Sequence, residues 1–269
     1  MIAVSSRDNA QIKRFCRLRD KNRERRETGC IVLEGARLCA DAAATGTSIE
    51  TAFVTERALA AYPEATNALC AAAAQTLLVS EAVASHMAET EHPQGVFAVA
   101  AMPQSSLDIA ALPLCGRYLA LESVRDPGNL GTIVRTAEAF GIDGLLLSGD
   151  CCDLFSPKVL RAAMGGTLRL PFAVVDDLPA AIADWRRQGF ETYACVALAD
   201  AEPLLPGKLG AGCIPVIGNE GNGLTDAAIA ACGRRLTIPM AGRAESLNAA
   251  VAACIVLWEL SRPEDTPHG

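Results

Sequence analysis

Hydrophobic and polar positions along roughly the first hundred residues alternate between helical and strand-like patterns. Between residues 9 and 26, apolar positions recur at near-helical spacing among basic residues, which predicts an amphipathic helix with a cationic outer face. Short apolar runs and helical runs then follow one another, as is typical of a small α/β domain. The predicted strands are 30–33, 49–54, 76–79 and 95–101, and the further predicted helices are 36–44, 65–74 and 81–87.

Pro103, a pair of serines and Pro113 interrupt this alternation with the composition of a linker. We therefore predict a first domain over residues 1–102, a linker over 103–115 and a second domain over 116–262. A polar tail at 263–269 is expected to be flexible.

Apolar strands followed by helices predict a mainly parallel sheet in the second domain, with ligands bound at the carboxyl ends of its strands. Asn129 is expected to cap the first helix of this domain, over 130–140, and Gly141 to close it. Ser246 is expected to cap the last helix, which runs to Leu260. The predicted strands are 117–121, 144–147, 172–175, 191–196, 214–217 and 235–238.

The charge of the chain is unevenly distributed. The 269 residues are 51% hydrophobic and 20% charged, with a formal net charge of -7 that argues against a general binder of polyanions. The first 26 residues nevertheless carry nine basic and three acidic side chains. This cationic segment is either a solvated helix or an electrostatic footprint for nucleic acid.

The eleven cysteines are mostly set in apolar runs, and their number is odd. They are typical of small buried hydrophobic residues in a reducing cytoplasm. Because no Cys-x-x-Cys occurs and the chain has only three histidines, we expect no metal site. The longest apolar run is too short to cross a bilayer and the first residues lack the pattern of a signal peptide, so we expect no membrane association.

The segment 121–135 places an Asp-Pro-Gly turn directly after a predicted strand. On the helix that follows, Arg135 falls away from the centre of the apolar stripe and near the end that carries the loop. It either reaches into a cleft above the sheet or is an ordinary solvated arginine.

The segment 214–224 brings three glycines to the end of another apolar strand, where they let the backbone approach a ligand or form an ordinary turn. Glu220 favours a site, since turn chemistry alone does not require a carboxylate there. The segment matches neither Gly-x-Gly-x-x-Gly nor a Gly-Lys-Ser/Thr motif, which argues against a nucleotide-dependent oxidoreductase.

In the segment 236–248, a strand ends in Pro239 and a glycine-containing loop leads to the last helix. Asn248 is expected in the first turn of that helix, where its amide contacts a functional group, the backbone or solvent.

The joint occurrence of these three segments, in this order, resembles the SpoU (TrmH-type) branch of the SPOUT superfamily of RNA ribose methyltransferases. The first domain is similar to the family's substrate-binding domain, which is akin to small ribosomal RNA-binding proteins. The matching motifs are Asn129-x-Gly131-x-x-x-Arg135, Gly218-x-Glu220-x-x-Gly223-Leu224 and Ile238-Pro239-Met240-x-Gly242-x-x-x-Ser246-Leu247-Asn248. In the first domain, the stretches that match the family's substrate-binding domain are residues 6–13, Glu34-Gly35 and His92-Pro93-Gln94-Gly95-Val96.

This resemblance implies an α/β substrate-binding domain followed by an α/β catalytic domain with a trefoil knot, although knots are rare in proteins. It further implies that the loops after Val196, Ile217 and Ile238 bind S-adenosylmethionine and that the chain forms a homodimer through its catalytic domain. The implied cofactor-binding residues are Gly218, Ile238, Leu247, Met240, Asn219, Leu198 and Gly223.

The reaction implied is methyl transfer to a ribose 2′-hydroxyl, with Arg135 at its centre. Arginine holds its proton with a pKa above about 12, so phosphate binding or stabilisation of a developing alkoxide is physically easier for it than proton abstraction. Asn129, Glu220, Ser246 and Asn248 would orient Arg135 and the RNA. The ribosomal-protein-like domain favours rRNA over tRNA, and the basic residues expected to contact RNA are Lys13, Arg14, Arg23, Arg25 and Arg26. A noncatalytic RNA-binding or ribosome-assembly protein on the same fold is the alternative.

Overall fold

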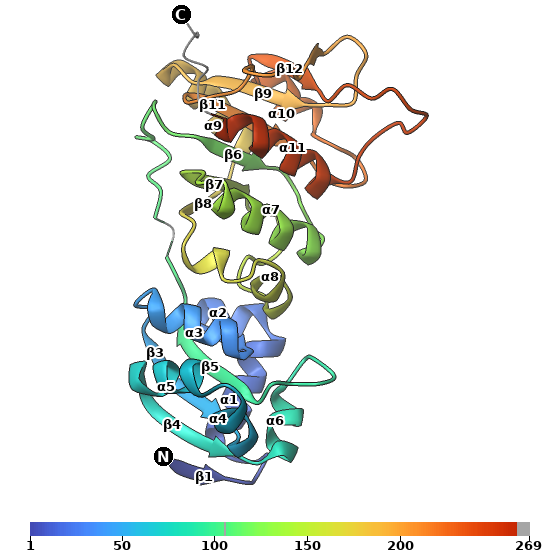
Figure 1. Ribbon diagram of the computed structural model, residues 1–269. Coiled ribbons are helices and arrows are strands. Elements are labelled where there is room, and N and C mark those ends of the chain that lie inside the picture. The colour runs from blue at the N-terminus through green and yellow to red at the C-terminus, as the bar shows by residue number, and fades with distance from the viewer. Residues whose placement is uncertain (105, 263–269) are drawn as a thin grey trace, which may run out of the picture. The chain divides into compact units, whose positions relative to one another are not determined.

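The computed structural model describes residues 1–104 and 106–262, and its contacts divide the chain into two compact units (Figure 1). The first unit comprises Met1–Gln104 together with Phe155–Arg169, and the second comprises Ser105–Leu154 and Leu170–Gly269. The tail predicted at 263–269 lies outside the described residues. Among those described, no helix combines the length and apolar character needed to cross a membrane.

The first unit is built on a five-stranded mixed sheet in the order β1-β4-β3-β5-β2. β3 and β4 are parallel, as are β4 and β1, whereas β5 runs antiparallel to both β3 and β2. The strands are β1 Ile2–Val4, β2 Cys30–Glu34, β3 Ile49–Val54, β4 Ala73–Val79 and β5 Val96–Ala101. The helices are α1 Ala10–Asp20, α2 Asn22–Thr28, α3 Ala36–Ala44, α4 Glu56–Ala61, α5 Pro63–Ala72 and α6 Glu81–Met87.

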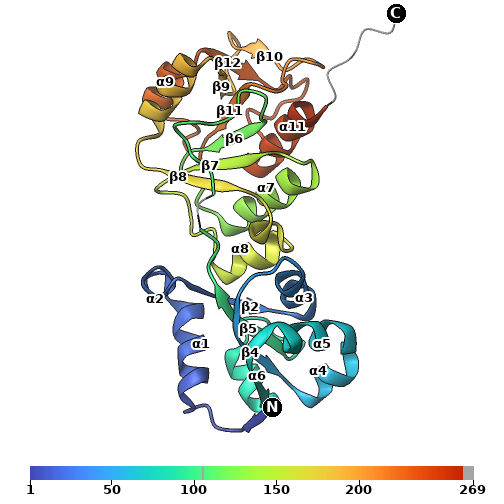
Figure 2. The same ribbon diagram turned by 90° about the vertical axis from the view of Figure 1, so that its left-hand side faces the viewer.

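An aromatic cluster fixes α1 to this sheet. Phe15 is buried and meets the rings of Phe53 and Phe97 edge to face, at centroid distances of 5.6 and 5.7 Å. Figure 2 shows α1 on one side of the sheet and α3 and α5 on the other. The helices therefore bury both faces, as expected for an α/β unit.

The helix predicted over 9–26 is divided in two by Lys21, whose backbone is extended. Asn9 caps α1 and Gly29, with a φ of 62°, ends α2. The buried guanidinium of Arg25 donates to the carbonyls of Leu18 and Arg19, at 2.5 and 3.0 Å. Arg25 thus satisfies carbonyls at the end of α1 and stabilises the break, which the hydrophobic pattern does not predict.

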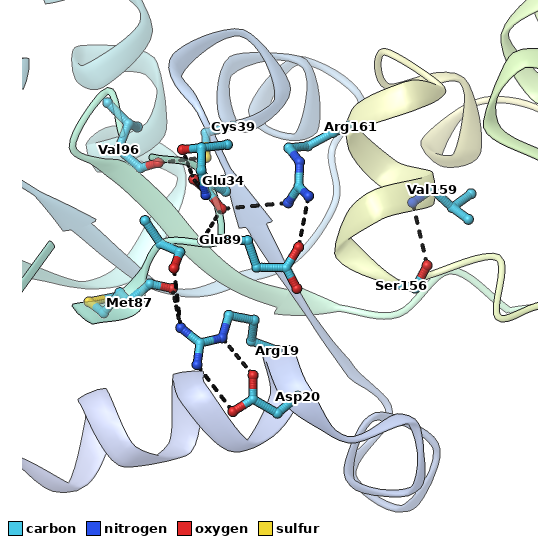
Figure 3. Close-up of polar contacts among 12 residues, drawn as sticks. Arg19, Asp20, Glu34, Cys39, Met87, Glu89, Val96, Ser156, Val159 and Arg161 are labelled. Atoms are coloured by element: carbon cyan, nitrogen blue, oxygen red, sulfur yellow. Dashed lines mark hydrogen bonds and ion pairs between the residues drawn. The ribbon is translucent and has the colours of Figure 1, made fainter. Parts of the chain in front are cut away.

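The segment Phe155–Arg169 contains α8 Pro157–Ala162 and the short helix η1 Gly166–Leu168, and its contacts place it in the first unit. Arg161 on α8 lies 2.7 Å from Glu89 and 3.6 Å from Glu34, as drawn in Figure 3. Glu34 is nine-tenths buried and also accepts the backbone N–H groups of Glu89 and Thr90. This carboxylate therefore joins α8 to the loop that follows α6.

The second unit contains a seven-stranded sheet in which every pairing is parallel, as the apolar strands predict, in the order β10-β12-β9-β11-β6-β7-β8. The strands are β6 Tyr118–Leu121, β7 Gly144–Ser148, β8 Phe172–Val175, β9 Glu191–Cys195, β10 Glu202–Pro203, β11 Cys213–Ile217 and β12 Arg234–Thr237. The helices are α7 Pro127–Ala139, α9 Leu178–Gln188, α10 Asp226–Ala231 and α11 Ala249–Ser261. α7 and α11 pack against each other (Figure 1).

Two helix caps differ from the prediction, while Gly141 closes α7 with a positive φ of 65° as predicted. Asp126, not Asn129, caps α7, because Pro127 starts the helix and the Asp126 side chain accepts the N–H of Asn129 at 2.8 Å. Asn248, not Ser246, caps α11 by accepting the N–H groups of Ala250 and Val251. These caps leave the Asn129 side chain available for other contacts.

Candidate functional site

Loops at the carboxyl ends of β9, β11 and β12 surround a cavity of about 500 Å³ in the second unit. This volume is suited to a small molecule of cofactor size. The charged residues that line it are Glu220 and Asp226, and its lining contains no lysine or arginine. The other lining side chains are apolar, amide or hydroxyl groups, so the cavity favours a neutral or cationic ligand over a phosphate.

The turn after β11, residues 219–223, can be built only if the residue before it is glycine. A Cβ on Gly218 would lie 2.2 Å from the backbone carbon of Gly223. Asn219 and Gly223 exchange two backbone hydrogen bonds of 3.0 Å, and Gly223 has a positive φ of 69°. This narrow turn presents backbone to the cavity.

The Asn219 side chain makes one hydrogen bond within the turn and another to a neighbouring loop. Its Oδ1 accepts the N–H of Gly221 at 2.8 Å, and its Nδ2 donates to the carbonyl of Ser123 at 2.7 Å. The second bond ties the turn to the loop after β6.

Three polar side chains from separate segments form a hydrogen-bonded row. Asn129 Nδ2 donates to Glu220 Oε1 at 2.9 Å, and Asn248 Nδ2 donates to Asn129 Oδ1 at 3.1 Å. Partial burial raises the pKa of Glu220, but hydrogen bonds from Asn129 and from backbone groups outweigh it, so its pKa lies below the usual value. Glu220 is therefore held as an acceptor-only carboxylate at neutral pH.

Arg135 is exposed on α7, and no hydrogen bond or ion pair holds its guanidinium within the described residues. Its five N–H donors are consequently available to a substrate.

The structure brings together most of the candidates named from the sequence. All seven residues proposed to hold the cofactor line the cavity, and so do Glu220 and Ser246. Asn129 and Asn248 are connected to the cavity through Glu220, whereas no hydrogen bond or ion pair among the described residues links Arg135 to the row.

Sequence reasoning missed Glu122, a buried carboxylate at the end of β6. Its two oxygens accept the N–H and the hydroxyl of Thr225, each at 2.8 Å, and so connect β6 to the start of α10. A carboxylate placed between an apolar strand and a turn was the available signal.

The basic residues of the first unit are largely neutralised within the chain. Lys13 pairs with Asp8 at 2.8 Å, Arg14 with Glu50 at 2.6 Å and Arg23 with Glu27 at 2.6 Å. Arg25 is buried, so the structure gives it the structural role described above instead of an RNA contact. Of the five candidates, Arg26 is the exposed one for which the described residues supply no partner.

Comparison with known proteins agrees with this architecture. Residues 116–258 match the sequence profile of the SpoU rRNA Methylase family, and residues 9–98 match that of the MRM3-like substrate binding domain. The chain belongs to the SpoU rRNA Methylase family. Its two matched regions follow the order of a substrate-binding domain and a methylase domain.

Relatives within the SpoU family align over nearly the whole chain. An uncharacterized tRNA/rRNA methyltransferase of Synechocystis sp. is 34% identical over 97% of this chain and 94% of its own length. The 23S rRNA (guanosine(2553)-2′-O)-methyltransferase RlmP of Bacillus subtilis is 32% identical over 97% of this chain and 99% of its own.

Solved structures of SpoU-family enzymes share the fold. The AdoMet-bound rRNA methyltransferase of Sinorhizobium meliloti superposes with a TM-score of 0.81 at 31% identity, covering 96% of each chain. The SpoU methyltransferase AviRb of Streptomyces viridochromogenes, in complex with AdoMet, gives a TM-score of 0.80 at 26% identity, covering 94% of this chain and 97% of its own.

Proposed function

We propose that the protein transfers a methyl group from S-adenosylmethionine to a ribose 2′-hydroxyl of ribosomal RNA. The observation that carries this proposal is the cavity at the strand ends, which is lined by Glu220, the first member of the row Glu220-Asn129-Asn248, on a chain of the SpoU family. The RlmP relative, by its name, methylates a guanosine 2′-oxygen of 23S rRNA.

The cavity fits S-adenosylmethionine on its own chemistry. Its charged lining residues are acidic, which suits a positively charged sulfonium, and it offers backbone groups and apolar side chains to an adenosine. When bound, the cofactor supplies an electrophilic methyl group. Gly218, Asn219, Gly223, Leu198, Ile238, Met240 and Leu247 are the residues that would hold it.

Arg135 would act on the RNA. A guanidinium stays protonated at neutral pH, so it binds the phosphate next to the target ribose or stabilises negative charge that develops on the 2′-oxygen. Its lack of a partner among the described residues supports this role, since no ion pair has to break before RNA is bound.

The row of Glu220, Asn129 and Asn248 would position the reacting ribose. Each of these side chains is fixed by at least one neighbour, so polar groups are presented with little loss of rotamer freedom on binding. Ser246, exposed on the loop before α11, adds a hydroxyl at the rim of the cavity.

The first unit would bind the RNA substrate. This role is supported by the match to a substrate binding domain and by the exposed Arg26 on α2, for which the described residues supply no partner. Lys13, Arg14 and Arg23 contribute only if RNA phosphates replace their acidic partners.

Two α11 residues support a homodimer formed through the second unit. Val251 and Trp258 are 47% and 56% exposed, lie on the same face of the helix and line a hollow with Ile255. Exposed apolar patches of this kind mark protein interfaces.

The loops that line the cavity, after β9, β11 and β12, would form the trefoil knot of the SPOUT fold. A cytoplasmic location is supported by the proposed rRNA substrate and by the eleven unpaired cysteines.

Two measurements test the proposal. Calorimetry should show binding of S-adenosylmethionine, and total RNA from a strain lacking the gene should lose one 2′-O-methyl position that the purified protein restores. Absence of cofactor binding up to millimolar concentration, together with no tritium transfer to any RNA, would show that the protein is not a methyltransferase.

A further inference from the structure

Ser123, two residues after the end of β6, has a left-handed backbone with a φ of 55°. This conformation is unfavourable for a residue with a side chain and is neutral for glycine. Among the described non-glycine residues it is shared only with Met164. Interactions around Ser123 must therefore hold it in place.

Two side chains from the end of β7 supply those interactions. The Ser123 N–H donates to Ser148 Oγ at 2.9 Å, and the Ser123 hydroxyl donates to the carboxylate of Asp150. Ser148 Oγ in turn donates to Asp150 at 2.6 Å. Asp150 thus accepts both hydroxyls, which together lower its pKa and keep it charged at neutral pH.

The conformation of Ser123 has a direct consequence at the cavity. Its carbonyl accepts Asn219 Nδ2 at 2.7 Å, and Asn219 opens the turn 219–223 that lines the cavity. A serine in an ordinary extended or helical conformation would point this carbonyl elsewhere. An unbroken path of hydrogen bonds therefore runs from Asp150 through Ser123 to the turn.

We propose that Ser123 and Asp150 are positioning residues that hold the turn 219–223 in the shape required for cofactor binding. This role rests on the proposed function, because the turn is taken to hold S-adenosylmethionine. Neither residue lines the cavity, so both act through Asn219.

Substitutions at Ser123 distinguish the effect of its backbone conformation on cofactor binding from the effect of its hydroxyl. Ser123→Ala loses the bond to Asp150 and keeps the unfavourable φ, whereas Ser123→Gly loses the same bond and removes the penalty. Calorimetry should show the Kd for S-adenosylmethionine raised about tenfold in Ser123→Ala and in Asp150→Ala, and within about threefold of wild type in Ser123→Gly.

A double variant tests whether Asp150 works through Ser123. In the Ser123→Gly background, Asp150→Ala should raise the Kd much less than it does alone, because glycine needs no anchor to keep the conformation. Asp143→Asn is the matched control. Its carboxylate is exposed and accepts the N–H of Arg117 at 2.8 Å, at the opposite end of β7, and its Kd should equal that of wild type.

Hydrogen exchange gives a readout that needs no cofactor. In Ser123→Ala and Asp150→Ala, the amides of Asn219 and Gly223 should exchange faster, with the melting temperature of the protein nearly unchanged. At saturating cofactor, turnover should fall less than threefold while the KM for cofactor rises about tenfold.

The outcomes distinguish the two proposals. A wild-type protein that fails to bind S-adenosylmethionine contradicts the proposed function, whereas normal exchange of the 219–223 amides in both variants overturns the positioning role on its own. Cofactor Kd values within twofold of wild type in Ser123→Ala and Asp150→Ala also overturn it.

Discussion

The Asn129 amide donates to the Glu220 carboxylate at 2.9 Å and thereby joins the first turn of α7 to the turn after β11. Asn248 extends the contact to the start of α11 by donating to Asn129 at 3.1 Å. Asn129 is thereby joined to residues 91 and 119 positions away in the chain, and a substitution of this middle residue would disconnect both neighbours.

Asn129→Ala should reduce kcat/KM for methyl transfer by about 10- to 100-fold, because it removes a hydrogen bond to a charged group. Tritium transfer from labelled S-adenosylmethionine to rRNA measures this loss. Gln188→Ala, which removes an exposed amide at the end of α9, is the matched control and should retain wild-type transfer.

Arg135→Ala should abolish most methyl transfer without lowering the free energy of unfolding by more than about 0.5 kcal/mol, since Arg135 contacts no described partner. Arg135→Lys keeps the charge and loses the planar fork of donors, so it should recover only part of the activity. Full turnover and unchanged RNA affinity in the lysine variant would exclude a bidentate role for Arg135. Arg187→Ala on α9 serves as the surface control.

Trp258→Glu should convert the protein into a monomer, as measured by light scattering, because it puts a charge on the exposed face of α11. Trp258 packs against Phe140 with ring centroids 5.5 Å apart, so a small loss of stability is expected as well. Leu205→Glu changes a residue of similar exposure, 55% against 56%, and should leave the oligomeric state unaltered. A monomeric wild-type protein would contradict the homodimer.

Glu50→Gln should lower stability at neutral pH by about 0.5 kcal/mol, a small value because Arg14 and Glu50 are both partly exposed. The hydrogen bond from Arg14 holds the pKa of Glu50 below its ordinary value of 4.5. The stabilisation is therefore present above the unfolded pKa and disappears as the pH falls through the folded pKa. Urea unfolding of wild type and variant should differ in neutral buffer and coincide in strongly acid buffer, whereas Glu91→Gln, an exposed loop variant, should show no difference in either.

Arg25 and Arg26 should respond differently to substitution although they are neighbours. Arg25→Ala removes the donors that satisfy Leu18 and Arg19, so the free energy of unfolding should fall by about 1–3 kcal/mol. Arg26→Ala should leave the free energy of unfolding unchanged and weaken rRNA binding. The salt dependence of the affinity should show that about one counterion fewer is released on binding. Equal RNA affinity of Arg26→Ala and wild type would remove α2 from the RNA-binding surface.

The sequence predicts elements well where local signals agree. α3 and β3 have the predicted bounds, because Gly35 and Gly46 punctuate the apolar runs at their ends. The division of α1 from α2 was not predictable, since it depends on burial of Arg25 and Lys21 carries no helix-breaking signal. The cap of α7 was misassigned because Asp126 and Asn129 are both good capping residues and only Pro127 decides between them.

Some features of the candidate site were likewise predictable from the sequence and others were not. Glycines and polar residues at strand ends indicated a site at the loops after β11 and β12, whereas the loop after β9 was indicated only by the resemblance to the SpoU family. The bonds among Asn129, Glu220 and Asn248 depend on how distant segments fold together, and spacing along the chain does not contain that information. The left-handed backbone of Ser123 was equally hidden, because a serine gives no signal for a positive φ.

Because Phe155–Arg169 belongs to the first unit, this unit cannot be moved to another protein as a single continuous segment. A fragment that stops at Gln104 would lose Arg161 and Arg169, and with them the cationic partners of the carboxylates of Glu34 and Asp41. Its buried Glu34 would then keep only backbone and hydroxyl donors. Grafting this domain onto another enzyme by a single gene fusion would therefore deliver an incomplete fold, and recombination within the family is expected to exchange both pieces together.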